Sequence, residues 1–287
     1  MNIIAETELI LNTENKIYHL NLTKDEIADT IILVGDPDRV SIISNKFDSI
    51  EYKVQNREFI THTGTLNGKK ISAIATGIGT DNIDIVVNEL DALVNIDFKT
   101  RTINKKKKKL NLIRLGTSGA LQKDIEVGSF LVSFFGLGFD NIAHFYKSEE
   151  IIEHDMSNKY MKHANWPENL STPYIVKASD NLLSLFTDIK KGITATAPGF
   201  YGPQGRILRL KPNITNLHEK MESFNYEENK ITNFEMETSA LYYLGQSLGH
   251  NTITICAIIA NRLTKEYSKN YKKTVEEMIN LVLKRIC

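Results

Sequence analysis

Short apolar runs alternate with longer amphipathic stretches along the whole chain. Residues 30–34, 110–113, 192–197 and 252–260 have the length and composition of buried strands. Residues 83–94 place apolar side chains every three or four positions, which is typical of a helix that covers a sheet. Strands that alternate with helices predict an α/β fold, and we expect three α/β/α layers around a mixed, largely parallel central sheet.

Turn-forming residues predict further elements. Asn67-Gly68 separates residues 59–66 from residues 69–76, which is a strong signal for a two-residue β-hairpin. Pro37 and Asp38 predict the start of a helix that runs to about residue 47. We also expect strands at 128–135 and 231–234, a helix that ends near residue 249, and an amphipathic C-terminal helix; residues 141–173 give no clear pattern.

Composition changes this picture little. The 287 residues contain no Pro/Gly/Ser-rich linker, so we expect a single domain over residues 1–287. Lys+Arg and Asp+Glu balance at 35 each, which gives no reason to expect a nucleic-acid partner. Two cysteines are too few for a disulfide framework and favour a reducing cytoplasm. His144, His154 and His163 lack metal-ligand spacing, and we expect no metal site.

A lysine-rich insertion occupies about residues 97–110. Its five consecutive lysines, residues 105–109, suggest RNA binding or a localisation signal, but no aromatic residues interleave with them. We therefore interpret the insertion as a solvated surface loop. The apolar runs are far shorter than the ~20 residues of a membrane helix, so we expect no membrane partner. Residues 1–11 contain Glu6 and Glu8 and no basic leader, which argues against a secretory signal.

The first candidate for chemistry is the segment from Arg114 to Ala120. It follows the predicted strand at 110–113 and contains a cation, two glycines and two hydroxyls. Glycines let a backbone approach a ligand closely, and a guanidinium matches the geometry of phosphate. We therefore expect the strand to end before Arg114 and the following loop to bind an anion, with Thr117 adding a hydroxyl. An ordinary strand-to-turn junction with a surface arginine is the alternative.

Three other segments favour the same kind of site. Gly35 and Arg39 lie at the predicted strand-to-helix junction, and Arg57 stands at the entrance of the hairpin. Ligands of open α/β folds gather at the carboxyl ends of the strands, so these residues should converge with Arg114 on one phosphate. Glu235 and Glu237, on either side of Met236, would accept hydrogen bonds from the paired hydroxyls of a sugar. An aromatic face, an amide edge and a cation suit a planar heterocycle with alternating carbonyl and N–H groups, and these groups are Phe200, Gln204 and Arg206.

Other enzyme classes fit less well. Gly116-Thr117-Ser118-Gly119 misses the spacing of a nucleophile elbow by one residue, which argues against a serine hydrolase. No P-loop is present, which argues against kinases and NTPases. Asn82 stands where a dinucleotide fingerprint would need its third glycine.

Taken together, these segments resemble a known family, the nucleoside phosphorylases of the trimeric/hexameric type, and within it the uridine phosphorylases. The matching segments occur in the family's order and span nearly the whole chain from about residue 17. They are Tyr18-His19-Leu20, Gly35-Asp36-Pro37-Asp38-Arg39, Arg57-Glu58-Phe59, Thr76-Gly77-Ile78-Gly79, residues 114–120, residues 200–206, Glu235-Met236-Glu237 and Asn261-Arg262.

The resemblance implies phosphorolysis of uridine and related pyrimidine nucleosides by inorganic phosphate, which gives uracil and ribose 1-phosphate. Phosphate is then a co-substrate, and no cofactor is needed. The resemblance also implies a homo-oligomer with a dimer as its minimal unit, which a hexamer would extend. The implied phosphate-binding residues are Gly35, Arg39, Arg114, Thr117 and, from the neighbouring subunit, Arg57. The implied ribose-binding residues are Glu235, Met236, Glu237 and, from the neighbour at the 5′ end, His19. The implied base-binding residues are Phe200, Gln204, Arg206, Ile259, Ala260 and Arg262, and those with catalytic roles are Arg114, Gln204 and Arg206.

The choice of base depends on two of these segments. Purine-cleaving members of the family carry an aspartate after the last buried strand, where this chain has Asn261-Arg262. The spacing of Phe200, Gln204 and Arg206 matches that of the residues that recognise uracil in the uridine phosphorylases. The resemblance therefore favours uridine. The alternatives are a purine or broad-specificity phosphorylase, a nucleosidase that uses water, and a nucleoside-binding protein without activity.

Overall fold

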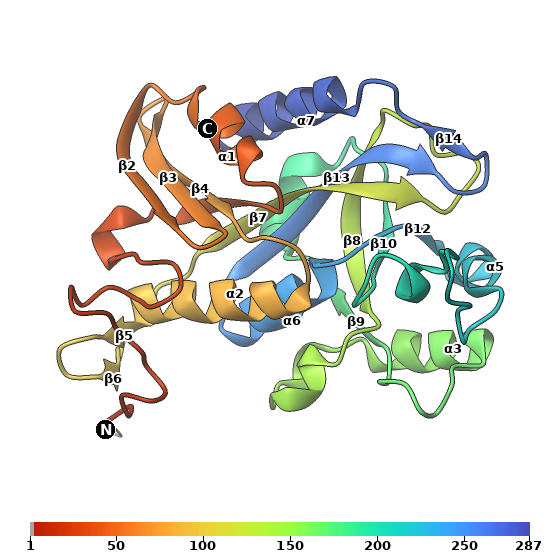
Figure 1. The fold of residues 1–287 in the computed structure, drawn as a ribbon, viewed down its shortest axis with the longest axis horizontal. Coiled ribbons are helices and arrows are strands. Elements are labelled where there is room, and N and C mark those ends of the chain that lie inside the picture. The colour runs from red at the N-terminus through yellow and green to blue at the C-terminus, as the bar shows by residue number, and fades with distance from the viewer. Residues whose placement is uncertain (1–2) are drawn as a thin grey trace.

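The computed structural model describes residues 3–287, so residues 1 and 2, which begin the N-terminal segment assessed above, lie outside the described residues. A 12-stranded sheet forms the centre of the molecule (Figure 1). Its strands are β1 (Thr30–Val34), β2 (Ser49–Asn56), β3 (Phe59–Leu66), β4 (Lys69–Ala75), β7 (Asn111–Ala120), β8 (Phe130–Gly138), β9 (Tyr174–Lys177), β10 (Lys191–Thr196), β11 (Asn225–Tyr226), β12 (Asn229–Glu235), β13 (Asn251–Asn261) and β14 (Glu266–Tyr267).

Helices cover both faces of this sheet. The α-helices are α1 (Asp38–Ser44), α2 (Thr80–Asn95), α3 (His154–Ala164), α4 (Asp180–Leu183), α5 (Leu217–Ser223), α6 (Thr238–Ser247) and α7 (Tyr271–Ile286). Helices α1 and α7 lie above the sheet in Figure 1, and α2 and α6 lie side by side below it. The predicted α/β fold with a mixed sheet is confirmed.

The middle of the sheet is mainly parallel. Parallel pairing joins β1 to β4 and β7, β7 to β13, and β10 to β8 and β12. Strand β12 also pairs antiparallel with β7, where Phe234 lies opposite Gly119. Strands β7, β13, β8, β10 and β12 therefore close into a ring, a feature that the sequence pattern did not predict.

Several predicted elements are confirmed. Strand β1 and the hairpin of β3 and β4 have the expected positions, and Asn67 and Gly68 both have the positive φ values that this turn requires. Helix α1 ends at Ser44, three residues before the predicted end. Strand β8 starts at Phe130, two residues after its predicted start. The segment without a clear pattern contains α3.

The prediction that a strand ends before Arg114 is wrong. Strand β7 continues to Ala120, because both edges of the glycine segment find partners: β13 pairs along one edge and β12 along the other. Gly116 provides room rather than a turn, since a Cβ at this position would overlap the folded-back guanidinium of Arg114. The anion-binding candidate is thus part of the central strand.

The lysine-rich insertion lies at the edge of the molecule. Strands β5 (Ile96–Asp97) and β6 (Thr102–Ile103) form a small separate hairpin, and the five lysines that follow are all exposed. Lys108 forms an ion pair with Asp29, with Nζ and Oδ1 2.5 Å apart. Within residues 3–287, no helix combines the length and the apolar character needed to cross a membrane.

Candidate active site

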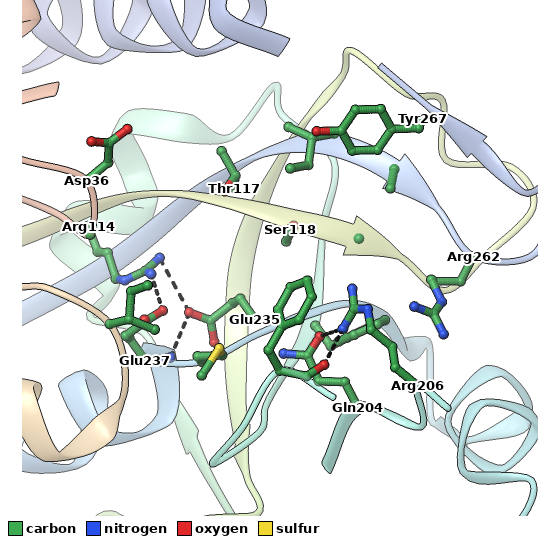
Figure 2. A pocket seen from close by; sticks show the side chains of 18 of the residues that line it. Asp36, Arg114, Thr117, Ser118, Gln204, Arg206, Glu235, Glu237, Arg262 and Tyr267 are labelled. Carbon is green, nitrogen blue, oxygen red and sulfur yellow. Dashed lines mark hydrogen bonds and ion pairs between the residues drawn. The ribbon is translucent and has the colours of Figure 1, made fainter. Parts of the chain in front are cut away.

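One cavity of about 740 Å³ opens where β1, β7, β12 and β13 reach their carboxyl ends (Figure 2). This is the edge of an α/β sheet at which ligand sites usually form. The cavity brings together residues that are more than 200 positions apart in the chain. The residues that line it are Gly35, Asp36, Pro37, Arg39, Ile78, Arg114, Thr117, Ser118, Gly119, Phe200, Gln204, Arg206, Phe234, Glu235, Met236, Glu237, Ile259, Ala260, Arg262 and Tyr267.

All but two of the residues proposed from the sequence line this cavity. The exceptions are His19 and Arg57, the two expected to reach the site of a neighbouring subunit. They lie together instead in a partly exposed cluster with Tyr18 and Asn56. Arg57 Nη2 donates a hydrogen bond to Tyr18 Oη at 3.2 Å, and Asn56 Nδ2 donates to the carbonyl oxygen of His19 at 2.8 Å.

Two guanidiniums mark one end of the cavity. Arg39 donates a hydrogen bond to the carbonyl oxygen of Leu115 at 3.3 Å, and its Nε lies 3.7 Å from Asp36 Oδ2. Burial lowers the pKa of Arg39; the charge of Asp36 opposes this shift and that of Arg114 adds to it. Two arginines that repel each other beside the hydroxyl of Thr117 form a site that favours an anion.

Arg114 lies between two buried carboxylates. Its Nη2 pairs with Glu237 Oε2, and its Nη1 lies 3.4 Å from Glu235 Oε2. Within residues 3–287, Nε and Nη1 have no hydrogen-bond partner although both are buried. An unpaired guanidinium N–H is costly in the interior, so Arg114 retains donors for a ligand. Figure 2 shows the guanidinium turned towards the carboxylates, so an anion near Arg39 would share it with them.

The two carboxylates perform different tasks. Glu235 accepts a hydrogen bond from Thr196 Oγ1 at 2.8 Å and from the backbone N–H groups of Glu237 and Thr238 at 3.0–3.1 Å. These two N–H groups belong to the start of α6, so Glu235 acts chiefly as a cap of that helix. Glu237 Oε1 accepts only the N–H of Gly79, at 2.9 Å, within residues 3–287. Glu237 is therefore the carboxylate with capacity for sugar hydroxyls.

Glu237 also has an unusual acidity. Burial raises its pKa to about 7, while the charge of Arg114 opposes the shift and that of Glu235 adds to it. The carboxyl thus titrates near neutral pH, at the centre of the cavity. Perturbed acidity of this kind is common at functional sites.

The other end of the cavity is made from a loop between β10 and α5. Arg206 donates a hydrogen bond to the carbonyl oxygen of Phe200 at 2.7 Å and a shorter one to Gln204 Oε1. Its Cζ lies 3.7 Å from the centre of the Phe200 ring. The pairing orients the Gln204 amide, whose Nε2 donates no hydrogen bond to another residue within residues 3–287 (Figure 2). Burial, with the nearby charge of Arg262, lowers the pKa of Arg206 to about 10.

The turn after β13 supports the cavity without offering it a proton. Asn261 is buried, and its Nδ2 donates to the carbonyl oxygens of Gln122 and Ile125 at 2.8–2.9 Å. Its Oδ1 accepts the backbone N–H groups of Leu263 and Thr264. The side chain is fully used in holding the turn that carries Arg262 into the cavity.

Sequence reasoning missed part of the lining. Tyr267 comes from the short strand β14, which folds back beside Ala260 and had no strand signal of its own. Ser118 lies four positions after Arg114 on β7, and Phe234 lies two positions before Met236 at the end of β12, so the two-residue period of a strand could have indicated both. The remaining unpredicted members are Asp36, Pro37, Ile78 and Gly119.

Metal ligands do not gather in the cavity or elsewhere in the part of the chain that the structure describes. No group of three His, Cys, Asp or Glu side chains there could hold a metal ion. His144, His154 and His163 instead each lie within hydrogen-bond distance of a backbone carbonyl oxygen.

Comparison with known proteins gives this geometry a family. The model of the phosphorylase superfamily matches residues 29–287. The chain belongs to the phosphorylase superfamily. This assignment covers every strand of the central sheet and every residue that lines the cavity.

Several members of the superfamily resemble this chain over most of its length. A uridine phosphorylase of Thermococcus kodakarensis is 30% identical over 89% of this chain and 81% of its own. A DeoD-type purine nucleoside phosphorylase of Bacillus velezensis is 28% identical over 92% and 97%. Among solved structures, the Trypanosoma brucei nucleoside phosphorylase, which shows uridine phosphorylase activity, has a TM-score of 0.83 and 27% identity over 96% and 98%.

Proposed function

We propose that this protein is a uridine phosphorylase, a pentosyltransferase that converts uridine and related pyrimidine nucleosides with inorganic phosphate into the free base and ribose 1-phosphate. The observation that carries the proposal is the order of groups along one cavity: paired arginines, then a carboxylate with free capacity, then an amide and a guanidinium beside an aromatic ring. This order matches phosphate, ribose and uracil. Two of the relatives given above, from Thermococcus kodakarensis and Trypanosoma brucei, support it.

The reaction follows from this arrangement. A phosphate oxygen forms a bond to the anomeric carbon while the bond from that carbon to N1 of uracil breaks, and the electron pair leaves with the base. Arg39 and Arg114 would hold the dianion against a sugar that becomes positively charged in the transition state. Glu237 would accept the sugar hydroxyls. Gln204 and Arg206 would stabilise the negative charge on the leaving base, where preorganised donors contribute most.

The base end favours a pyrimidine. A leaving purine is assisted by a proton from a carboxyl, and the side chain at the corresponding turn is Asn261, which has no proton of suitable acidity and is occupied by backbone partners. Uracil needs donors for its oxygens and an acceptor for N3–H, which Arg206 and Gln204 supply. A purine or broad-specificity phosphorylase is the second candidate, because DeoD-type relatives match nearly the whole chain.

One assay tests the proposal. The protein is incubated with uridine, thymidine, inosine or adenosine, with and without inorganic phosphate, and the released bases are quantified. We expect uracil release that depends on phosphate, and little release of hypoxanthine or adenine. Preferred release of purines would support the second candidate. Equal release without phosphate would indicate a nucleosidase, and binding without release a protein that only binds nucleosides.

We also propose that the active unit is at least a dimer in which His19 and Arg57 complete the neighbour's cavity. Both residues lie outside the cavity of their own chain, and Arg57 has φ of 52°, an uncommon conformation for a residue with a side chain. Arg57 lies in the turn between the antiparallel strands β2 and β3, and backbone strain retained at such a turn is consistent with a functional role.

Mixed oligomers test this shared site. Subunits with Arg57→Ala or with Arg206→Ala should each form weakly active homo-oligomers. In a co-expressed mixed dimer, one site carries both defects and the other carries neither, so about half of the sites should recover normal kcat/KM. Activity of purified mixed dimers no higher than that of the homo-oligomers would contradict the shared site.

Two simpler expectations accompany the reaction. It needs no cofactor besides the co-substrate phosphate, so a chelator such as EDTA should leave the rate unchanged. Both cysteines are free thiols, Cys256 buried and Cys287 exposed, which suits a reducing compartment, and we propose a cytoplasmic location.

A further inference from the structure

We propose that Glu89 is a positioning residue that fixes the ring of His19 for its contact with the 5′-hydroxyl of the nucleoside bound by a neighbouring subunit. Glu89 lies on α2 and does not line the cavity. The inference rests on the proposed function, because the role of His19 at the 5′ end belongs to that proposal.

Glu89 binds the His19 segment through three hydrogen bonds. Its Oε1 accepts the backbone N–H of His19 at 3.0 Å and lies 2.6 Å from Nδ1 of the same ring. Its Oε2 accepts the backbone N–H of Leu20 at 2.8 Å. One carboxylate therefore holds both the backbone and the side chain of the loop that carries His19, across 70 positions of sequence.

Aromatic neighbours confine the ring further. The ring of Tyr18 meets His19 edge to face, with centroids 4.9 Å apart, and that of Phe59 lies 6.5 Å away. The side chain of His19 is 27% exposed and that of Glu89 is 12% exposed, so the carboxylate lies behind the ring and the ring faces the solvent. Within residues 3–287, Nε2 of His19 has no hydrogen-bond partner.

This arrangement selects one form of the imidazole. An ionised carboxylate accepts hydrogen bonds and donates none, so Nδ1 must carry a hydrogen. In the neutral ring, Nε2 is then an acceptor, which suits the hydrogen of a primary hydroxyl. A carboxylate that sets the tautomer and direction of a histidine in this way acts through the histidine and does not itself contact the substrate.

The test compares two substrates that differ only at the predicted contact. We expect Glu89→Gln, and more strongly Glu89→Ala, to lower kcat/KM for uridine by about tenfold, the effect of one well-aligned hydrogen bond. For 5′-deoxyuridine, which lacks the hydroxyl, the change should stay within about twofold. In a His19→Ala background, Glu89→Gln should add no more than about twofold for uridine.

A matched control is present on the same helix. Asp91 Oδ1 lies 3.3 Å from Nε2 of the buried His250, so α2 carries a second carboxylate–histidine pair away from this cluster. Asp91→Asn should change kcat/KM for both substrates by the same factor. The thermal midpoint and oligomer mass of each variant show whether it is folded, and Glu89→Gln retains an acceptor oxygen for the loop if Glu89→Ala does not fold.

Three results would overturn the inference: equal loss on both substrates in Glu89→Gln, independent and multiplicative effects of Glu89 and His19, or a preference for uridine over 5′-deoxyuridine that is undiminished in His19→Ala. None of these touches the proposed function, which is tested separately by the base release of the wild-type protein with and without phosphate.

Discussion

The two ends of the cavity are built in opposite ways. At the proposed anion and sugar end, Arg114 projects from within β7 and Glu237 from the junction between β12 and α6, and they are only 4% and 3% exposed. At the base end, Phe200 belongs to a loop and Tyr267 to a two-residue strand, and they are 49% and 64% exposed. The first end is held by the sheet, and the second by a few local contacts.

In the proposed reaction, the buried end would act on the transition state and the exposed end would select the base. Charges that act on the transition state gain from a fixed and buried arrangement, since they need no reorganisation during the reaction. Groups that select the base can lie on a loop, where substitution costs the fold little. The same mutation type should therefore have different consequences at the two ends.

The largest effect is expected for Arg114→Ala. It removes the cation between Glu235 and Glu237 and leaves two carboxylates buried without compensation. We expect kcat/KM to fall on the order of 1,000-fold and the free energy of unfolding to fall by about 3–5 kcal/mol. Steady-state kinetics and urea denaturation at pH 7 measure both. A fully stable variant would mean that the carboxylates are not held ionised by Arg114.

Arg206→Ala should affect activity and leave stability nearly unchanged. Its guanidinium binds the loop that carries it and lies over the face of Phe200, and its Cζ lies 5.5 Å from the centre of the Phe234 ring on β12. We expect kcat for uridine to fall on the order of 100-fold, while the free energy of unfolding changes by less than about 1 kcal/mol. Near-normal turnover of uridine would remove Arg206 from the base site.

Within the buried end of the cavity, substitutions of Glu237 and Glu235 should also differ, because the first should mainly lower activity and the second should mainly lower stability. Glu237→Gln removes a charged acceptor of the sugar hydroxyls, and we expect kcat/KM to fall about 10- to 100-fold. Glu235→Gln should mainly weaken the start of α6, with about 1 kcal/mol lost in unfolding experiments. If both variants lost activity equally at equal stability, Glu235 would also be a sugar ligand.

The smallest effect is a pH dependence. Because burial raises the pKa of Glu237 to about 7, its accepting form is lost below that value, and kcat/KM should decline as the pH falls from about 8 to 6. The folded state also binds more protons than the unfolded chain between the ordinary value of 4.5 and about 7, so this carboxyl lowers stability as the pH rises through that interval. The stability trend should be absent in Glu237→Gln, and the decline in kcat/KM should be shallower than in the wild type, because only the protonation of the phosphate dianion then remains.

The sequence predicts the parallel strands and the residues at their ends, because apolar runs and glycine-arginine segments are local signals. It does not predict that β7 continues through Gly116 to Ala120, since this depends on partners from β12 and β13 that are more than 100 positions away. It likewise does not predict that Glu235 caps α6 while Glu237 keeps capacity for sugar hydroxyls. This difference depends on the hydrogen bonds of the two carboxylates with Thr196 and Gly79. Tyr267 reaches the cavity only because β14 folds back onto β13.

Helix α2 connects the cavity to the cluster that carries His19. Gly79, at its start, donates to Glu237 inside one cavity, and Glu89, ten residues later, holds the loop of His19 on the outer surface. Ten residues of helix span roughly 15 Å and resist compression along the axis. In the dimer proposed above, we expect a sugar that draws the carboxylate away from Gly79 to shift the helix together with its far anchor, so that ligand binding in one subunit changes the affinity of the neighbouring cavity. Saturation curves of the intact oligomer would register this as a Hill coefficient different from one.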